Sequence, residues 1–91
     1  MYNTLTMSNK LEILKKRIIY RASYRGTKEM DILLTNFVNK YINILDEKSL
    51  LELDIFLNID DETILDFYQR NKIVKNIKDN TISNLFKDFK I

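Results

Sequence analysis

The apolar positions of residues 30–45 follow the period of an α-helix. They recur three and four residues apart over about four turns, which places them on one face of the helix. This spacing predicts a helix that begins after Gly26, with Thr27 as its N-cap, and that forms the centre of the core. Its apolar positions are Met30, Leu33, Leu34, Phe37, Val38, Tyr41, Ile42 and Leu45.

A second helical pattern precedes this one. Ser8 is a favourable N-cap residue, and apolar positions with helical spacing follow it up to Tyr24. We therefore predict a helix over residues 9–24 and a flexible extension over residues 1–8. The inward stripe of this helix consists of Leu11, Leu14, Ile18 and Ala22.

The second half of the chain predicts three shorter helices. Asp46 is expected to cap a helix over residues 47–58, Asp60 a helix over residues 61–69, and Asn80 a last helix. Residues 70–79 are compatible with a short helix or with a loop pinned to the core. The apolar positions are Leu50, Leu53, Phe56 and Leu57 in the third helix, Ile64, Leu65 and Tyr68 in the fourth with Phe67 at its margin, Ile73, Val74 and Ile77 in the linker, and Ile82, Leu85, Phe86 and Phe89 at the end.

The composition agrees with one small all-α domain. The chain has 91 residues, no Pro, a single Gly and 45% hydrophobic residues. This length supports one core, and a strand-rich fold would need more turn residues. We predict a compact single-domain bundle of about five short helices over residues 9–91.

Missing residue types exclude several functions. The chain has no Cys and no His, which excludes disulfides, thiolate or imidazole metal sites, and nucleophiles activated by histidine. Catalysis would have to depend on carboxylates, Lys or Tyr, so an enzyme is disfavoured. No apolar run approaches the roughly 20 residues of a membrane span, and no signal or transit peptide is visible. We therefore expect a cytoplasmic protein without a membrane partner.

The charges are segregated along the chain. Between Lys10 and Lys28 there are seven basic residues and one acidic residue, whereas between Glu29 and Asp66 there are ten acidic and two basic residues. We interpret these blocks as helix faces that pair within the bundle. A dipolar surface that orients a charged partner is the other interpretation.

The segment Tyr24–Asp31 joins the two predicted helices at a corner. It holds the only glycine, and because Gly takes φ > 0 without steric cost, Gly26 predicts a helix stop and a tight turn. Glu29 and Asp31 fall in the first turn of the next helix, where acidic groups interact favourably with the helix dipole. Glu29 also lies four residues after Arg25, which predicts a surface ion pair. Glu29 and Asp31 point about 200° apart on a helix, so they do not form a catalytic pair.

The basic helix before the corner raises one alternative. With Tyr20 and Tyr24 it could contact phosphates and stack on bases. The first turn of the following helix carries carboxylates, however, which would repel phosphate. A small basic helical nucleic-acid-binding or regulatory protein is therefore the alternative hypothesis, and we expect no nucleic-acid partner.

The segment Lys16–Asp31 resembles the signature of the succinate dehydrogenase flavinylation factors, the SdhE/CptB family. That signature is an Arg-Gly-x-x-Glu corner, usually with Asp two residues later and a basic, Tyr-containing helix before it. Arg25, Gly26, Glu29 and Asp31 match it position by position. Residues 45–47, 60–61 and 85–89 lie where the family has its later helix starts and its closing helix. The chain departs from the family at Asp61-Glu62, where Asp-Pro is common, and at Phe67, where a Trp is common.

The resemblance implies an assembly factor rather than an enzyme. Such a factor binds the flavoprotein subunit of succinate dehydrogenase, with fumarate reductase as a further client, in the bacterial cytoplasm. It promotes covalent attachment of FAD to a histidine of that subunit, so FAD is carried by the partner and no cofactor is bound stably here. We expect a monomer when the protein is free. The residues expected to contact the partner are Arg21, Tyr24, Arg25, Gly26, Glu29 and Asp31, with Gly26 permitting close approach of the backbone.

Overall fold

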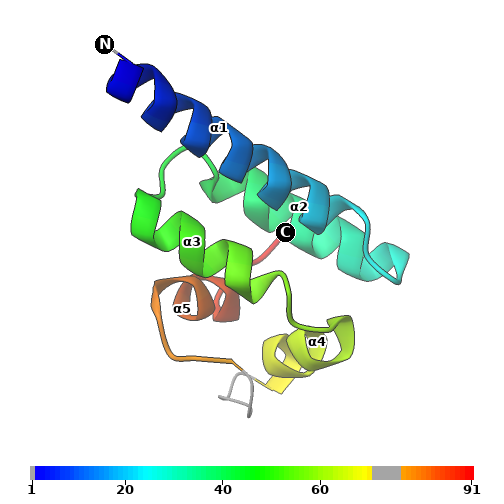
Figure 1. Ribbon diagram of the computed structural model, residues 1–91. Helices are drawn as coiled ribbons and strands as arrows, with labels where there is room; N and C mark the ends of the chain where they lie inside the picture. The colour runs from blue at the N-terminus through cyan, green and yellow to red at the C-terminus, as the bar shows by residue number, and fades with distance from the viewer. Residues whose placement is uncertain (1, 71–76) are drawn as a thin grey trace.

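The structure is a computed structural model that describes the backbone of residues 2–70 and 77–91 and the side chains of residues 9–70 and 77–91. This part of the chain contains helices and no strand, which confirms the predicted all-α bundle (Figure 1). None of these helices is both long and apolar enough to cross a membrane. The helices are α1 (Tyr2–Ser23), α2 (Lys28–Tyr41), α3 (Glu47–Phe56), α4 (Asp61–Arg70) and α5 (Thr81–Lys87).

Helix α1 packs on both α2 and α3 (Figure 1). It begins at Tyr2, so the prediction that Ser8 caps a helix starting at residue 9 is wrong. Residues 2–8 contain no Gly or Pro, and nothing in them stops the helix from extending towards the N-terminus. The predicted flexibility of residues 1–8 stays a prediction. The inward stripe is confirmed, with Leu14, Ile18 and Ala22 buried and Leu11 packed against the core.

Helix α2 buries its apolar face in the core, as its pattern predicts. The Thr27 side chain accepts a hydrogen bond from the Met30 N–H at 3.2 Å, which confirms the N-cap. The helix ends at Tyr41 instead of continuing to Leu45. The apolar spacing persists because a turn follows, in which the N–H groups of Ile44 and Leu45 donate to the Tyr41 carbonyl. The buried residues of α2 are Met30, Leu33, Leu34, Phe37 and Val38.

The caps of the three later helices are confirmed. Asp46 accepts a hydrogen bond from the Ser49 N–H at 2.9 Å, and Asp60 accepts one from the Thr63 N–H at 3.0 Å. Asn80 and Ser83 form a reciprocal capping box. The bond from the Ser49 N–H lowers the pKa of Asp46, and bonds from the Thr63 hydroxyl and N–H lower the pKa of Asp60.

Phe86 of α5 lies at the centre of an aromatic cluster. Its ring centroid is 5.1 Å from those of Phe37 and Phe56, 6.5 Å from that of Phe67 and 5.0 Å from that of Tyr68. Phe67 is fully buried, so its predicted place at the margin of α4 is wrong. It faces inward because it lies three residues after the buried Ile64, on the side of α4 that packs on α5.

The linker before α5 is described only from Ile77 onward. Ile77 is buried in the core, in agreement with an anchored linker. The predictions for Ile73 and Val74 lie outside the described residues.

Replacing Phe86 by alanine is expected to lower the free energy of unfolding by about 3–5 kcal/mol, because it removes the ring that joins α2, α3 and α4. Urea unfolding followed by circular dichroism measures this loss. Tyr24→Ala serves as the control: it truncates an exposed aromatic residue and should change stability by less than about 0.5 kcal/mol. Equal losses in the two variants would contradict the assigned core.

The two aspartate caps make the protein less stable in acid. Because folding lowers the pKa of Asp46 and Asp60, their contribution is complete above the pKa of the unfolded chain and is lost as the pH falls through the folded value. The free energy of unfolding should therefore fall below about pH 4. Asn also caps helices but does not titrate, so the double variant Asp46→Asn, Asp60→Asn should show a shallower decline. If the free energy of unfolding of the double variant falls below about pH 5 as steeply as that of the wild type, the two caps are not the origin of the loss of stability in acid.

Candidate partner-binding site

The corner between α1 and α2 is braced by Asp61, the first residue of α4. Asp61 Oδ1 accepts a hydrogen bond from Arg25 Nε at 2.7 Å and also lies 2.7 Å from Arg25 Nη2. Asp61 Oδ2 accepts a hydrogen bond from the Gly26 N–H at 2.7 Å. One carboxylate therefore binds both the side chain and the backbone of the corner.

Arg25 is an internal residue, with only 9% of its side chain exposed. Its remaining guanidinium bonds go to backbone carbonyls: Nη1 donates to Leu57 at 2.8 Å and to Arg21 at 3.1 Å, and Nη2 donates to Ile59 at 3.0 Å. These contacts fasten the end of α1 to the segment between α3 and α4. Arg25 thus holds the corner together from inside.

The predicted surface pair between Arg25 and Glu29 is not formed. Asp61 takes that place, because it meets Arg25 in a partly buried position where water competes less for the ions. Glu29 lies on the exposed first turn of α2 and has no hydrogen bond or ion pair with the described residues. Its carboxylate is accessible to a partner.

The positive φ predicted for Gly26 is also wrong. Its φ lies outside the left-handed region, so the turn does not require glycine for its backbone conformation. A Cβ at this position would lie 3.1 Å from Asp61 Oδ2, closer than an ordinary van der Waals contact. Glycine is favoured here because the Asp61 carboxylate approaches the backbone closely to accept its hydrogen bond.

Asp31 faces partly inward at the same corner. Its Oδ1 accepts a hydrogen bond from the Thr35 hydroxyl at 3.2 Å, and that hydroxyl also lies 3.2 Å from the Ala22 carbonyl oxygen. Thr35 therefore links the first turns of α2 to the end of α1. Asp31 supports the corner rather than projecting from it.

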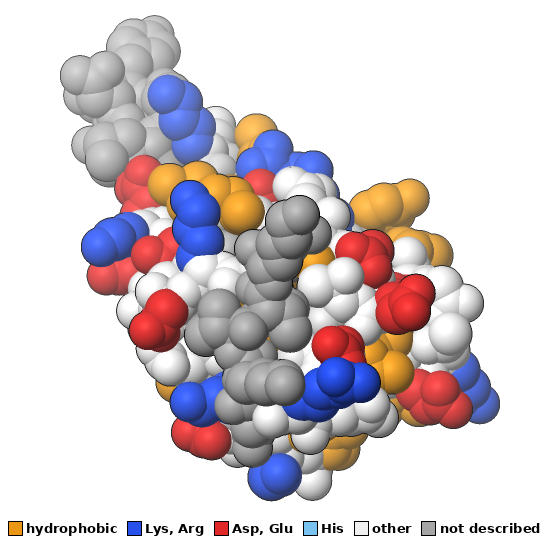
Figure 2. All heavy atoms as spheres, turned by 90° about the horizontal axis from the view of Figure 1, so that it is seen from below, with side chains coloured by type: hydrophobic (Ala, Val, Ile, Leu, Met, Phe, Trp, Pro, Cys, Tyr) orange, Lys and Arg blue, Asp and Glu red, His pale blue; other side chains and the backbone are white. Residues whose placement is uncertain are grey.

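Arginines of α1 bind acidic and polar groups of α3 and of the turn that follows it. Arg17 donates to Asp54 through Nε at 3.3 Å and Nη2 at 2.9 Å. Arg21 Nη1 lies 3.3 Å from Asp54 Oδ1 and donates to Asn58 at 2.6 Å. Together with Arg25 these residues form a row at four-residue intervals, so the three arginines of the basic block pair within the bundle, as predicted, whereas its lysines form no ion pair with the described residues. On the face seen in Figure 2 acidic and basic side chains are interspersed, which does not favour a dipolar surface there.

Two exposed aromatic residues, one in the last turn of α1 and one just after it, lie next to the corner. Tyr24 is 73% exposed and Tyr20 is 64% exposed, and their ring centroids are 4.6 Å apart. Of the six predicted contact residues, Tyr24, Gly26 and Glu29 are exposed, whereas Arg21, Arg25 and Asp31 are engaged with other parts of the chain. The structure thus divides the six residues into three that are exposed at the corner and three that hold it in place.

Sequence reasoning missed Asp61 and Asp54 as members of this site. For Asp61 a signal was present, since a helix N-cap needs one acceptor and Asp60 already provides it. The carboxylate of Asp61, the second of the two consecutive aspartates, is therefore free to bind a group outside its own helix. For Asp54 the signal is weaker: it is an acidic residue between the apolar residues Leu53 and Ile55.

Comparisons with known proteins agree with the motif at the corner. Residues 16–90 match a family described as the flavinator of succinate dehydrogenase. The mitochondrial succinate dehydrogenase assembly factor 2 of Scheffersomyces stipitis is 36% identical over 69 residues, which cover 76% of this chain and 46% of that protein. The chain thus spans about half the length of this curated relative. No solved structure gave a significant match.

Asp61→Asn is expected to lower the free energy of unfolding by about 2 kcal/mol, because the single amide oxygen cannot accept from both Arg25 and Gly26 and the buried guanidinium loses its counter-ion. Chemical unfolding measures this change. Asp66→Asn is a matched control: Asp66 pairs with Arg70 at the same 2.7 Å, but both side chains are more exposed. That variant should cost less than about 0.5 kcal/mol. Similar costs in both variants would contradict the bracing role of Asp61.

Proposed function

The chain belongs to the succinate dehydrogenase flavinator family, and from this membership we propose that it assists succinate dehydrogenase assembly by promoting covalent attachment of FAD to a histidine of the flavoprotein subunit. The family match covers residues 16–90, and these include the whole corner and the Asp61 that braces it. The match also confirms the resemblance read from Lys16–Asp31. The name of the Scheffersomyces stipitis relative supports the coarser part of the proposal, a role in assembly.

In this proposal the chain binds and does not catalyse. It contains no histidine or cysteine, so the histidine that receives FAD is a residue of the partner. FAD is a substrate held by the flavoprotein. The chain acts by binding more tightly to the flavoprotein conformation that holds the isoalloxazine ring against that histidine, and so raises the population of this conformation.

The braced corner is the observation that carries the proposed contact. The Asp61 carboxylate fixes Arg25 and the Gly26 backbone in one arrangement before any partner arrives. A surface that is already ordered loses less conformational entropy on binding. We assign direct contact to Tyr24, Gly26 and Glu29.

The other three residues of the motif have a supporting role in this proposal. Arg21 and Arg25 hold the end of α1 against α3 and the segment after it, and Asp31 holds the start of α2. Substitutions of Arg25 would therefore act on the shape of the corner, and so on binding, without removing a contact to the partner.

The nucleic-acid alternative has less support. Arg21 and Arg25 are the arginines nearest to the exposed Tyr20 and Tyr24, and both are engaged with acceptors on α3 or after it. Phosphate would have to compete with Asp54 and Asp61 for them.

Glu29→Lys is expected to reduce covalent flavinylation about tenfold, because it reverses an exposed charge at the contact without removing a bond that holds the fold. The measurement is in-gel flavin fluorescence of the denatured flavoprotein subunit from cells that carry the wild-type chain, a variant or no chain. Glu12→Lys is the control, since it makes the same charge change at an exposed position of α1 away from the corner.

Two results would count against the proposal. Equal fluorescence in cells with and without the chain would contradict the flavinylation role. Full fluorescence with a folded Glu29→Lys protein would contradict the placement of the contact at the first turn of α2.

A further inference from the structure

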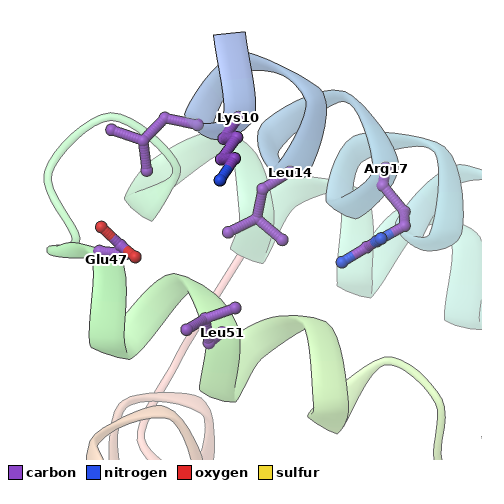
Figure 3. A pocket seen from close by; sticks show the side chains of 6 residues that line it. Lys10, Leu14, Arg17, Glu47 and Leu51 are labelled. Atoms are coloured by element: carbon purple, nitrogen blue, oxygen red, sulfur yellow. The ribbon is translucent and has the colours of Figure 1, made fainter. Parts of the chain in front are cut away.

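A groove between α1 and α3 lies apart from the corner, near the start of α3 (Figure 3). Its volume is about 390 Å³. Figure 3 shows side chains of α1 directed towards α3, with Leu14 facing Leu51 across the groove. The lining residues are Lys10, Leu11, Leu14, Arg17, Glu47 and Leu51.

Half of this groove lies outside the family match. Lys10, Leu11 and Leu14 come before residue 16, where the match begins, whereas Arg17 and the α3 residues lie within it. The groove is therefore formed in part by turns of α1 that precede the matched residues. The family motif at the corner does not account for it.

Exposed apolar residues connect the groove to the corner. Ile13 is exposed one turn before Arg17, and Tyr20 follows on the same side of α1, with Tyr24 just after the end of the helix. On α3, Leu51 is 46% exposed at the groove itself. A series of large exposed apolar side chains that leads to a proposed contact favours a protein partner over an isolated small molecule.

Two cationic side chains of α1, Lys10 and Arg17, line the groove. Arg17 is held by Asp54 through Nε and Nη2, which leaves Nη1 without a hydrogen bond to the described residues and fixed in position at the rim. Lys10 adds a second cation, and it forms no ion pair with the part of the chain that the structure describes. Glu47 is the one carboxylate among the lining residues, and Asp54 already offsets the charge of Arg17. An acidic group would therefore be bound through the free N–H donors of Lys10 and Arg17 and not through a net positive charge.

We propose that this groove is a second contact for the same flavoprotein partner, and that it binds an apolar side chain flanked by a carboxylate on the partner's surface. Leu14 and Leu51 would enclose the apolar side chain, while Lys10 and Arg17 would bind the carboxylate. This inference rests on the proposed function. It extends the contact from the corner along α1 onto α3.

The test is the dissociation constant between the purified chain and the purified flavoprotein subunit, measured by isothermal titration calorimetry. Lys10→Glu and Leu51→Glu should each weaken binding about tenfold. Both positions are exposed, so both variants should keep the helical circular dichroism of the wild type. Lys90→Glu is the matched control for the charge reversal, and it should bind like the wild type.

The outcomes separate this inference from the proposed function. If the wild type binds and Glu29→Lys weakens binding while both groove variants bind normally, the groove inference is overturned and the proposed function stands. If the wild type does not bind the flavoprotein, both are overturned. Analytical ultracentrifugation tests whether the chain associates with itself. If it does, and if Leu51→Glu abolishes this association, the groove binds a second copy of the chain and the inference is also overturned.

Discussion

The Asp61 carboxylate sets the geometry of the corner. One of its oxygens neutralises the Arg25 guanidinium, and the other accepts the Gly26 N–H. A guanidinium this well shielded from water would be costly without its counter-ion, so the start of α4 has to remain beside the end of α1. Because one anion binds both groups, the corner is held in a single arrangement. The exposed Tyr24 and Glu29 are then presented from a fixed frame, which is what a partner-binding surface needs.

Most of the fold could be predicted because its signals are local. Thr27, Asp46, Asp60 and Asn80 each cap the helix that follows them, and a cap is recognised within a few residues of sequence. The errors occurred where no local signal exists. Nothing in residues 2–8 stops α1, and the apolar spacing of α2 continues into a turn that still packs on the core. Phe67 is the exception, because its spacing from Ile64 was a local signal, although the ring of Phe86 that it stacks on comes from α5.

The motif points to the residues of the candidate site, but it does not give their places in the fold. The partner of Arg25 lies 36 residues away, and helical spacing can suggest only the nearby Glu29. The same holds for Gly26, whose requirement comes from the approach of Asp61 and not from its own backbone angles. Tertiary contacts thus turned Arg25 and Asp31 inward and left Tyr24 and Glu29 exposed. In our proposal the motif therefore combines residues that shape the corner with residues that touch the partner.

Hydrogen–deuterium exchange of the chain, alone and with the flavoprotein subunit lacking covalent FAD, tests the central claim most directly. If the braced corner is the contact surface, amides of residues 24–31 will exchange more slowly in the presence of the flavoprotein, and those of α5 will not change. Protection confined to α5 or to the chain end, with residues 24–31 exchanging as in the free protein, would contradict the account.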